Sequence, residues 1–210
     1  MKRVLILSDS LGLPRDNPEF CSYEETWPVL LKEQGFLLHQ VSIGGATSGE
    51  LLAQTFYHKM FKPDITIVQV GIVDCAPRFV TKYELAILKK MSFVGKWLLT
   101  LMNKKSVRSL RNITYVSPSR FAYNIAEISK RLDHSEIYFL SILPASADYE
   151  RVLTGVTSNI SKYNLILKKA CGEQYIDLSS IPLNGVMSDG HHLNAIGHAF
   201  ITNEIITKLK

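Results

Sequence analysis

A short apolar run near the start of the chain, Val4 to Leu7, ends abruptly in the polar triplet Ser8-Asp9-Ser10. An unbroken apolar run of this length is typical of a strand that is buried on both faces of a parallel sheet. Gly12 and Pro14 then break the chain, which places Ser10 in the turn directly after the strand. Chemistry in open α/β sheets takes place at the carboxyl ends of such strands. Ser10 is therefore a candidate nucleophile, provided that a base can reach it.

Strand and helix signals alternate along the rest of the chain. We expect strands at 4–7, 36–41, 65–70, 136–143 and 174–178, helices at 24–35, 49–61, 80–110, 118–132, 158–171 and 195–209, and a loop at 145–156. The segment 65–70 is β-branched and almost entirely apolar, which predicts a strand in the middle of the sheet. Three positions suit helix N-caps: Thr47 or Ser48, Ser117 and Asn194. The alternation predicts an α/β fold with a doubly wound parallel sheet of five strands and right-handed crossovers.

The length of 210 residues is that of one domain, 1–210. Cys21, Cys75 and Cys171 are widely spaced and odd in number, so we expect free thiols in a reducing compartment. The basic start and the apolar run after it are too short for a signal peptide, and no run approaches the ~18 apolar residues of a spanning helix. These features favour a cytoplasmic protein.

The net charge of +5 is unevenly distributed. Residues 82–131 hold eleven Lys and Arg against two Glu, a local charge of +9, so that the remainder carries −4. In the helical pattern at 80–110, one apolar stripe faces several lysines. The stripe consists of Ile87, Met91, Val94, Leu98, Leu101 and Met102. Core packing is the favoured interpretation of this stripe, and contact with an anionic glycan or with the inner membrane face is the alternative. We treat 80–135 as a basic helical insertion or cover. The segment has no nucleic-acid-binding motif, and no such partner is expected.

Three strand ends and one distant loop are predicted to meet. The first three strands end in Ser10, in the pair Gly44-Gly45, and in Gly71 with Asp74. Parallel strands bring their carboxyl ends to one edge of the sheet, so these turns should be neighbours. The loop with Asp189 and His192 only has to fold over that edge to complete a site.

The residues at this edge suit acyl transfer. A serine hydroxyl needs a base, and the pKa of an unperturbed histidine, ~6.5, suits His192 for that role. Asp189, three residues earlier, can accept the other ring N–H and fix the tautomer. The backbone N–H groups of Ser10 and Gly45 can stabilise an oxyanion.

At these residues the chain resembles the SGNH (GDSL-type) serine hydrolases. The first block of that superfamily appears as Ser8-Asp9-Ser10-Leu11, and its Asp-x-x-His block appears as Asp189 to His192, followed by Leu-Asn. The oxyanion glycine of the second block matches Gly45, with Gly44 as the fallback. The resemblance covers the whole chain in order. It implies a three-layer, flavodoxin-like α/β/α fold and carboxyl-ester chemistry.

The third block departs from the family pattern. The family has Gly-x-Asn-Asp, whose Asn donates to the oxyanion, whereas this chain has Gly71-Ile72-Val73-Asp74, and valine cannot donate. The hole then has two donors, a replacement donor such as the nearby Arg78, or weaker catalysis. The stretch from Gly71 to Arg78 also resembles a subgroup associated with bacterial surface polysaccharide loci, which suggests a glycan ester as substrate.

Some polar residues near these motifs have simpler interpretations. We expect Asp9 to cap its turn, Asp74 to bind loop N–H groups, and His191 to be an exposed loop residue. Asp189, His191, His192 and His198 match no standard metal spacing, so we expect neither a metal nor another cofactor.

Three functions remain open. The first is an esterase that removes acetyl groups from a carbohydrate, in which Ser10 attacks, His192 carries the proton and Asp189 orients His192. The second is a carbohydrate O-acyltransferase with the same triad. The third is a catalytically weak module that binds glycans, for which Val73 is the support in the sequence.

Overall fold

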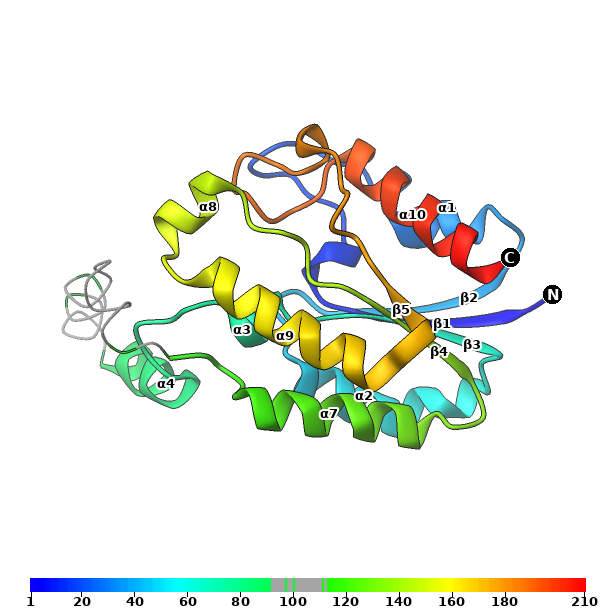
Figure 1. Ribbon diagram of the computed structural model, residues 1–210, viewed down its shortest axis with the longest axis horizontal. Helices are drawn as coiled ribbons and strands as arrows, with labels where there is room; N and C mark the ends of the chain where they lie inside the picture. The colour runs from blue at the N-terminus through cyan, green and yellow to red at the C-terminus, as the bar shows by residue number, and fades with distance from the viewer. Residues whose placement is uncertain (92–96, 98–99, 101–110, 112) are drawn as a thin grey trace.

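The computed structural model describes residues 1–91, 97, 100, 111 and 113–210. Its centre is a sheet of five parallel strands in the order β2-β1-β3-β4-β5 (Figure 1). The strands are β1 Arg3–Ser8, β2 Leu37–Ser42, β3 Ile65–Gln69, β4 Glu136–Leu140 and β5 Tyr175–Ile176. This is the flavodoxin-like order of doubly wound sheets, and it puts β3 in the middle. The fold class predicted from the sequence is confirmed.

Alternating side chains of β1 point to opposite faces of the sheet, as the period of a strand requires. Leu5 and Leu7 join one apolar core, whereas Val4 and Ile6 join the other. Since both faces are covered, the strand shows a continuous apolar run in the sequence rather than an alternation.

Helices form a layer on each face of the sheet (Figure 1). Helices α1, Trp27–Lys32, and α10, Ala195–Leu209, pack against each other on one face. On the other face, α7, Pro118–Arg131, contacts both α2, Ser48–His58, and α9, Val156–Cys171. Shorter helices complete the chain: α3 Ile72–Cys75, α4 Lys82–Lys90, α8 Ala147–Val152, and the 3-10 turns η1 Ser10–Gly12, η2 Lys59–Phe61, η3 Gly172–Gln174 and η4 Leu183–Gly185.

The predicted N-caps are confirmed. Thr47 precedes α2 and forms a capping box with Glu50. The Ser117 side chain accepts a hydrogen bond from the Arg120 N–H at the start of α7. Asn194 accepts from two backbone N–H groups of α10. These polar caps satisfy donors that the first helical turn leaves free, which explains why the helix starts can be recognised in the sequence.

Two expectations about local structure are wrong. The segment 145–156 is not a continuous loop, because α8 occupies Ala147–Val152 with Ser146 as its N-cap. The strands expected at 136–143 and 174–178 are also shorter, ending at Leu140 and Ile176. Beyond Leu140 the chain is buried without being a strand, since the Ile142 N–H and C=O bind the Asn164 side chain in place of a neighbouring strand.

The expectation of core packing along the stripe at 80–110 is wrong for the two members that the structure describes. Ile87 and Met91 are 42% and 44% exposed. Val94, Leu98, Leu101 and Met102 lie outside the described residues. Within 80–135, α7 belongs to the helical layer rather than to a cover. No helix among the described residues combines the length and apolar character needed to cross a membrane.

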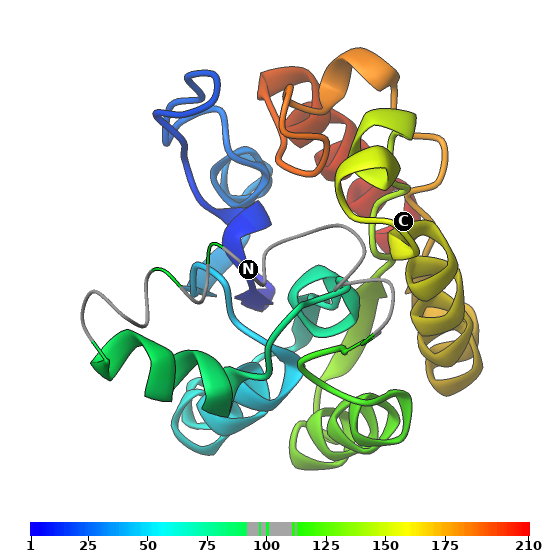
Figure 2. The same cartoon turned by 90° about the vertical axis from the view of Figure 1, so that its left-hand side faces the viewer.

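Figure 2 looks onto the edge of the sheet where the strands end. The loop after β1, helix α3 after β3, and α8 lie around this edge (Figure 2). β1 has β2 on one side and β3 on the other, so the chain reverses its winding direction here. Ligands of doubly wound folds bind at such a switch point.

Candidate active site

The turn after β1 holds Ser10 at the edge of the sheet. Asp9 caps η1, as expected, because its Oδ1 accepts a hydrogen bond of 3.0 Å from the Leu11 N–H. Asp9 is fully buried, and this burial raises its pKa to about 7. Gly12 is required here, since a Cβ atom would clash with Ser8 Oγ. The turn is therefore tightly packed, and Ser10 itself is only 9% exposed.

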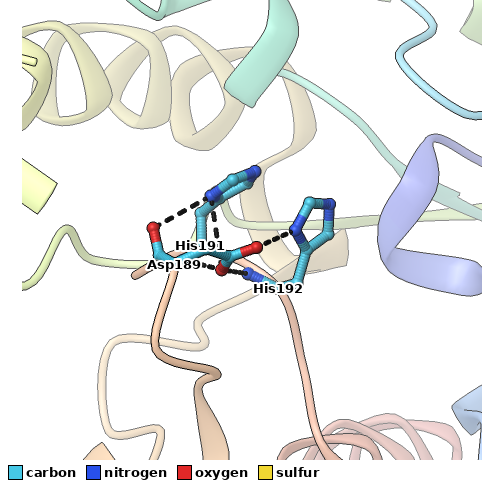
Figure 3. Close-up of side chains that lie close together, drawn as sticks. All are labelled: Asp189, His191 and His192. Carbon is cyan, nitrogen blue, oxygen red and sulfur yellow. Dashed lines mark hydrogen bonds and ion pairs between the residues drawn. The ribbon is translucent and has the colours of Figure 1, made fainter. Parts of the chain in front are cut away.

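The loop after η4 brings a histidine and an aspartate to this serine. His192 Nε2 lies 3.2 Å from Ser10 Oγ. On the other side of the ring, His192 Nδ1 lies 2.5 Å from Asp189 Oδ2 (Figure 3). Asp189 Oδ1 accepts the backbone N–H groups of His191 and His192, at 3.1 and 3.0 Å. The structure thus joins the three residues chosen from the sequence into one hydrogen-bonded chain across 182 positions of sequence.

The partner of Nδ1 indicates the tautomer of His192. An ionised carboxylate can only accept, so the ring proton is on Nδ1 and is donated to Asp189 Oδ2. Nε2 is then the nitrogen that accepts, and Ser10 Oγ and Arg15 Nη2 both lie against it. This is the tautomer in which a histidine can take a proton from a serine.

The pKa values of the pair favour a charged acid and a neutral base. Burial alone would raise the pKa of Asp189, but hydrogen bonds from His192 and His191 lower it to about 2. Burial lowers the pKa of His192 to about 4, helped by the positive charges of His191 and Arg15, while Asp189 opposes the shift. At neutral pH, His192 is therefore a neutral base beside an ionised carboxylate.

The second strand end supplies backbone donors. Gly45 has φ +72°, a conformation that favours glycine. Ser10, Gly44 and Gly45 all line the same cavity. Among the described residues, no acceptor pairs with the N–H group of Ser10 or of Gly45. Two unpaired N–H groups beside the candidate nucleophile Ser10 are what an oxyanion requires.

The turn after β3 holds the turn after β2 in place. Gly71 has φ +129°, and a Cβ atom there would lie 2.5 Å from Ile142 Cδ1. Asp74 is fully buried and accepts hydrogen bonds from the Ser48 N–H at 3.0 Å and the Ser48 hydroxyl at 2.5 Å. Asn124 donates to the same hydroxyl at 2.8 Å. Asp74 thereby ties α3 to the start of α2, directly after the Gly44-Gly45 turn, as its predicted loop-binding role required.

A cavity of about 410 Å³ opens over Ser10. Val73 and Ser10 line it together, so a side chain without a hydrogen-bond donor occupies the position that corresponds to the Asn of the SGNH pattern. The other lining residues are Ser10, Arg15, Gly44, Gly45, Ile72, Arg78, Tyr115, Tyr149, His191 and His192. Arg78, suggested by the sequence as a nearby cation, is among them.

Sequence reasoning did not identify Arg15, Tyr115 and Tyr149 as part of the site, and it gave His191 the wrong environment. His191 is not an exposed loop residue, because its ring is stacked on Tyr149 with centroids 5.0 Å apart and planes at 18°. The Arg78 guanidinium lies over the Tyr115 ring, with its Cζ atom 4.8 Å from the ring centroid. Arg15 follows the serine turn directly, and this proximity in sequence is the one signal that was available for it.

Asp189, His191 and His192 also lie close enough together to hold a metal ion (Figure 3). However, Asp189 Oδ2 already accepts from His192, and Oδ1 from two backbone groups. His198, the fourth member considered from the sequence, is instead buried on α10 and accepts the Trp27 N–H at 3.2 Å.

No family model and no curated protein matches the chain. Solved structures do match it over its full length. A lipase/acylhydrolase from Enterococcus faecalis has a TM-score of 0.68 at 12% identity, over 100% of this chain and 95% of that one. A GDSL-like lipase from Bacteroides thetaiotaomicron has a TM-score of 0.61 at 15% identity, over 98% and 86%.

A third structure is a catalytic mutant of an acetylxylan esterase from Geobacillus stearothermophilus. Its TM-score is 0.62 at 10% identity, over 99% of this chain and 94% of that one. At such low identities, the likeness concerns the fold. The chain has the three-layer fold of the GDSL-type (SGNH) hydrolases.

Proposed function

We propose that the chain is a serine esterase that cleaves a carboxyl ester, with an O-acetyl group on a carbohydrate as its substrate. The observation that carries this proposal is the hydrogen-bonded chain from Ser10 through His192 to Asp189. A serine, a neutral histidine of the correct tautomer and an ionised aspartate together form an activated nucleophile.

The geometry suggests the order of events. Ser10 Oγ forms a bond to the ester carbonyl carbon while its proton moves to His192 Nε2. The resulting oxyanion is stabilised by the N–H groups of Ser10 and Gly45, each of which contributes about 10²–10³-fold in rate by the precedent of similar sites. The carbon–oxygen bond to the sugar then breaks, and His192 returns its proton to the sugar oxygen. Water repeats the sequence on the acyl-enzyme and releases the acid.

The lining of the cavity supports a carbohydrate rather than a long acyl chain. Tyr115 and Tyr149 supply aromatic rings, and arginine and histidine supply polar groups around Ser10. A ring with an apolar body and a polar edge suits a sugar, which has both kinds of surface. The likeness in fold to an acetylxylan esterase agrees with this choice. The same proposal places this chain in the cytoplasm, where it would act in the synthesis of a bacterial surface polysaccharide.

Covalent labelling by a fluorophosphonate, measured by intact mass, tests this function without a choice of substrate. We expect one adduct on the wild type and none on Ser10→Ala. Ser119→Ala, at an exposed serine on α7, is the matched control and should label like the wild type. A folded wild type that does not label would refute the esterase and favour a catalytically weak glycan-binding module, which Val73 in the cavity lining supports.

A surface contact is a separate proposal. On α4, Tyr83 is 77% exposed, and Ile87, Lys89 and Lys90 are exposed as well. Apolar and basic side chains on one short helix suit the surface of an anionic membrane. Sedimentation with liposomes tests this: binding only to vesicles with anionic lipid is expected, and equal partition with and without it contradicts the proposal. Lys89→Glu together with Lys90→Glu should abolish the binding.

A further inference from the structure

The cavity over Ser10 carries an unbalanced positive charge. Arg15 and Arg78 both line it, and no Asp or Glu belongs to its described lining. A guanidinium stays charged at every pH that a protein tolerates. The Nε atoms of both arginines are buried and have no hydrogen-bond partner. These two atoms are closed off from the cavity, so a ligand reaches the arginines through other guanidinium atoms. The cavity thus presents two cationic groups beside Ser10.

The carboxylates at this edge of the sheet are bound elsewhere. Asp189 accepts from His192 and the backbone, and Asp74 accepts from Ser48. Asp9 is buried beneath the turn, with a pKa of about 7. Within the described part of the chain, neither arginine forms an ion pair with a carboxylate. Arg15 lowers the Asp9 pKa that burial raises, so these two groups attract each other without an ion pair. No described carboxylate therefore caps either guanidinium by direct contact.

Backbone contacts hold both arginines in place. Arg15 pairs with Cys21 through two hydrogen bonds, of 2.9 and 2.8 Å, which close the loop between them. The Arg78 N–H binds the Ile113 C=O at 2.8 Å, and its guanidinium lies over the Tyr115 ring. The planar fork of a guanidinium matches the oxygens of a carboxylate or a phosphate.

We propose that the substrate is an acidic carbohydrate ester, whose carboxylate or phosphate is bound by Arg78 and Arg15. This inference rests on the proposed esterase function and names its substrate class. The negative group balances the positive charge that the two guanidinium groups bring to the cavity.

Arg15 gives the anion a second effect, on the chemistry itself. Its Nη2 donates to His192 Nε2, the nitrogen that must accept the proton of Ser10. Both donors compete for one lone pair. An anion that binds Arg15 draws the guanidinium from the ring and leaves Nε2 to the serine. Acidic substrates are thus favoured in the reaction step as well as in binding.

Matched substrates test the inference. The probes are a mono-O-acetyl methyl glucuronoside, its neutral uronamide, and an O-acetyl hexose 6-phosphate beside its unphosphorylated form. We expect the wild type to prefer the charged member of one pair about tenfold or more in kcat/KM, the typical worth of a charge-assisted hydrogen bond. The pair that shows the preference identifies carboxylate or phosphate. High salt should reduce the preference.

Variants assign the preference to the cavity. Arg78→Met should lower the ratio of charged to neutral kcat/KM several-fold, because only Arg15 is left to bind the anion, and Arg78→Lys should keep more of the preference. Arg120→Met is the matched control, because this arginine lies over Tyr123 on α7 and should leave both activity and preference unchanged. Circular dichroism establishes that each variant is folded, and Arg78→Gln replaces Arg78→Met if that variant is not.

Three results would overturn the inference. Equal kcat/KM for both members of each pair would remove the acidic substrate while leaving the esterase intact. An equal loss for charged and neutral esters in Arg78→Met would make Arg78 an oxyanion donor instead. If no ester is cleaved and no fluorophosphonate adduct forms, the esterase fails, and equal calorimetric affinity of charged and neutral ligands for Ser10→Ala would then overturn the inference as well.

Discussion

Replacement of Asp189 by Asn is expected to lower kcat about 10⁴-fold, because the structure dictates how the new amide must orient. Oδ1 of Asp189 accepts two backbone N–H groups, so the amide oxygen of the variant has to take that place. The NH₂ group then faces His192 Nδ1, which must accept instead of donate. The ring proton moves to Nε2, and His192 can no longer take the proton of Ser10.

A loss of about 10⁴-fold corresponds to ~5.5 kcal/mol in the activation free energy and follows the precedent of the same change in a serine protease. The assay is kcat on an acetyl ester, with Asp177→Asn as the matched control. Asp177 accepts the Ser179 N–H after β5 and lies outside the cavity, so that variant should keep full activity. A folded Asp189→Asn variant within tenfold of the wild type would refute the role of Asp189 and the tautomer argument together.

Three further predictions concern other parts of the site. The pKa of His192 is lowered to about 4, so His192 stays neutral at mildly acidic pH. We therefore expect kcat/KM on a neutral ester to stay constant from pH 7 to pH 5 and to fall only near pH 4. A fall in kcat/KM near pH 6.5 would contradict the lowered pKa. Gly71→Ala should lower the free energy of unfolding, measured by urea titration, by about 3 kcal/mol, since φ +129° and the Ile142 contact both disfavour a side chain. Gly35→Ala is the control, because Gly35 has φ +87° but open space around it, and this variant should lose only about 1–2 kcal/mol. Equal losses in the two variants would count against a contribution from the Ile142 contact. Val73→Asn should speed fluorophosphonate labelling about tenfold or more by adding an oxyanion donor, whereas Val73→Leu should not; no gain in a folded Val73→Asn would show that this position does not reach the oxyanion.

The strand ends were predictable because they depend on local signals. Apolar runs broken by Ser10, Gly44-Gly45 and Gly71 mark the points where buried strands stop. Parallel topology then brings those points together without any knowledge of side-chain contacts. The pairing of His192 with Asp189 was also predictable, since they are three positions apart and one tight turn joins them.

The wall of the cavity was not predictable, because it depends on contacts between distant residues. Arg15 meets a histidine 177 positions away. Tyr149 belongs to α8, a helix of six residues that has too little apolar periodicity to be recognised, and its ring packs on His191. Substrate recognition in this fold thus depends on loops whose partners only the tertiary structure reveals.

Three aspartates at one edge of the sheet show how environment assigns different roles to the same side chain. Asp9 accepts the Leu11 N–H in a fully buried turn, and its pKa rises to about 7. Asp74, equally buried, is held by the N–H and hydroxyl of Ser48 and joins two loops. Asp189 is partly exposed and accepts from a histidine ring and two backbone groups, which lowers its pKa to about 2. Of the three, only Asp189 combines a negative charge at neutral pH with contact to His192, and this combination, rather than its residue type, suits it to be the acid of the proposed triad.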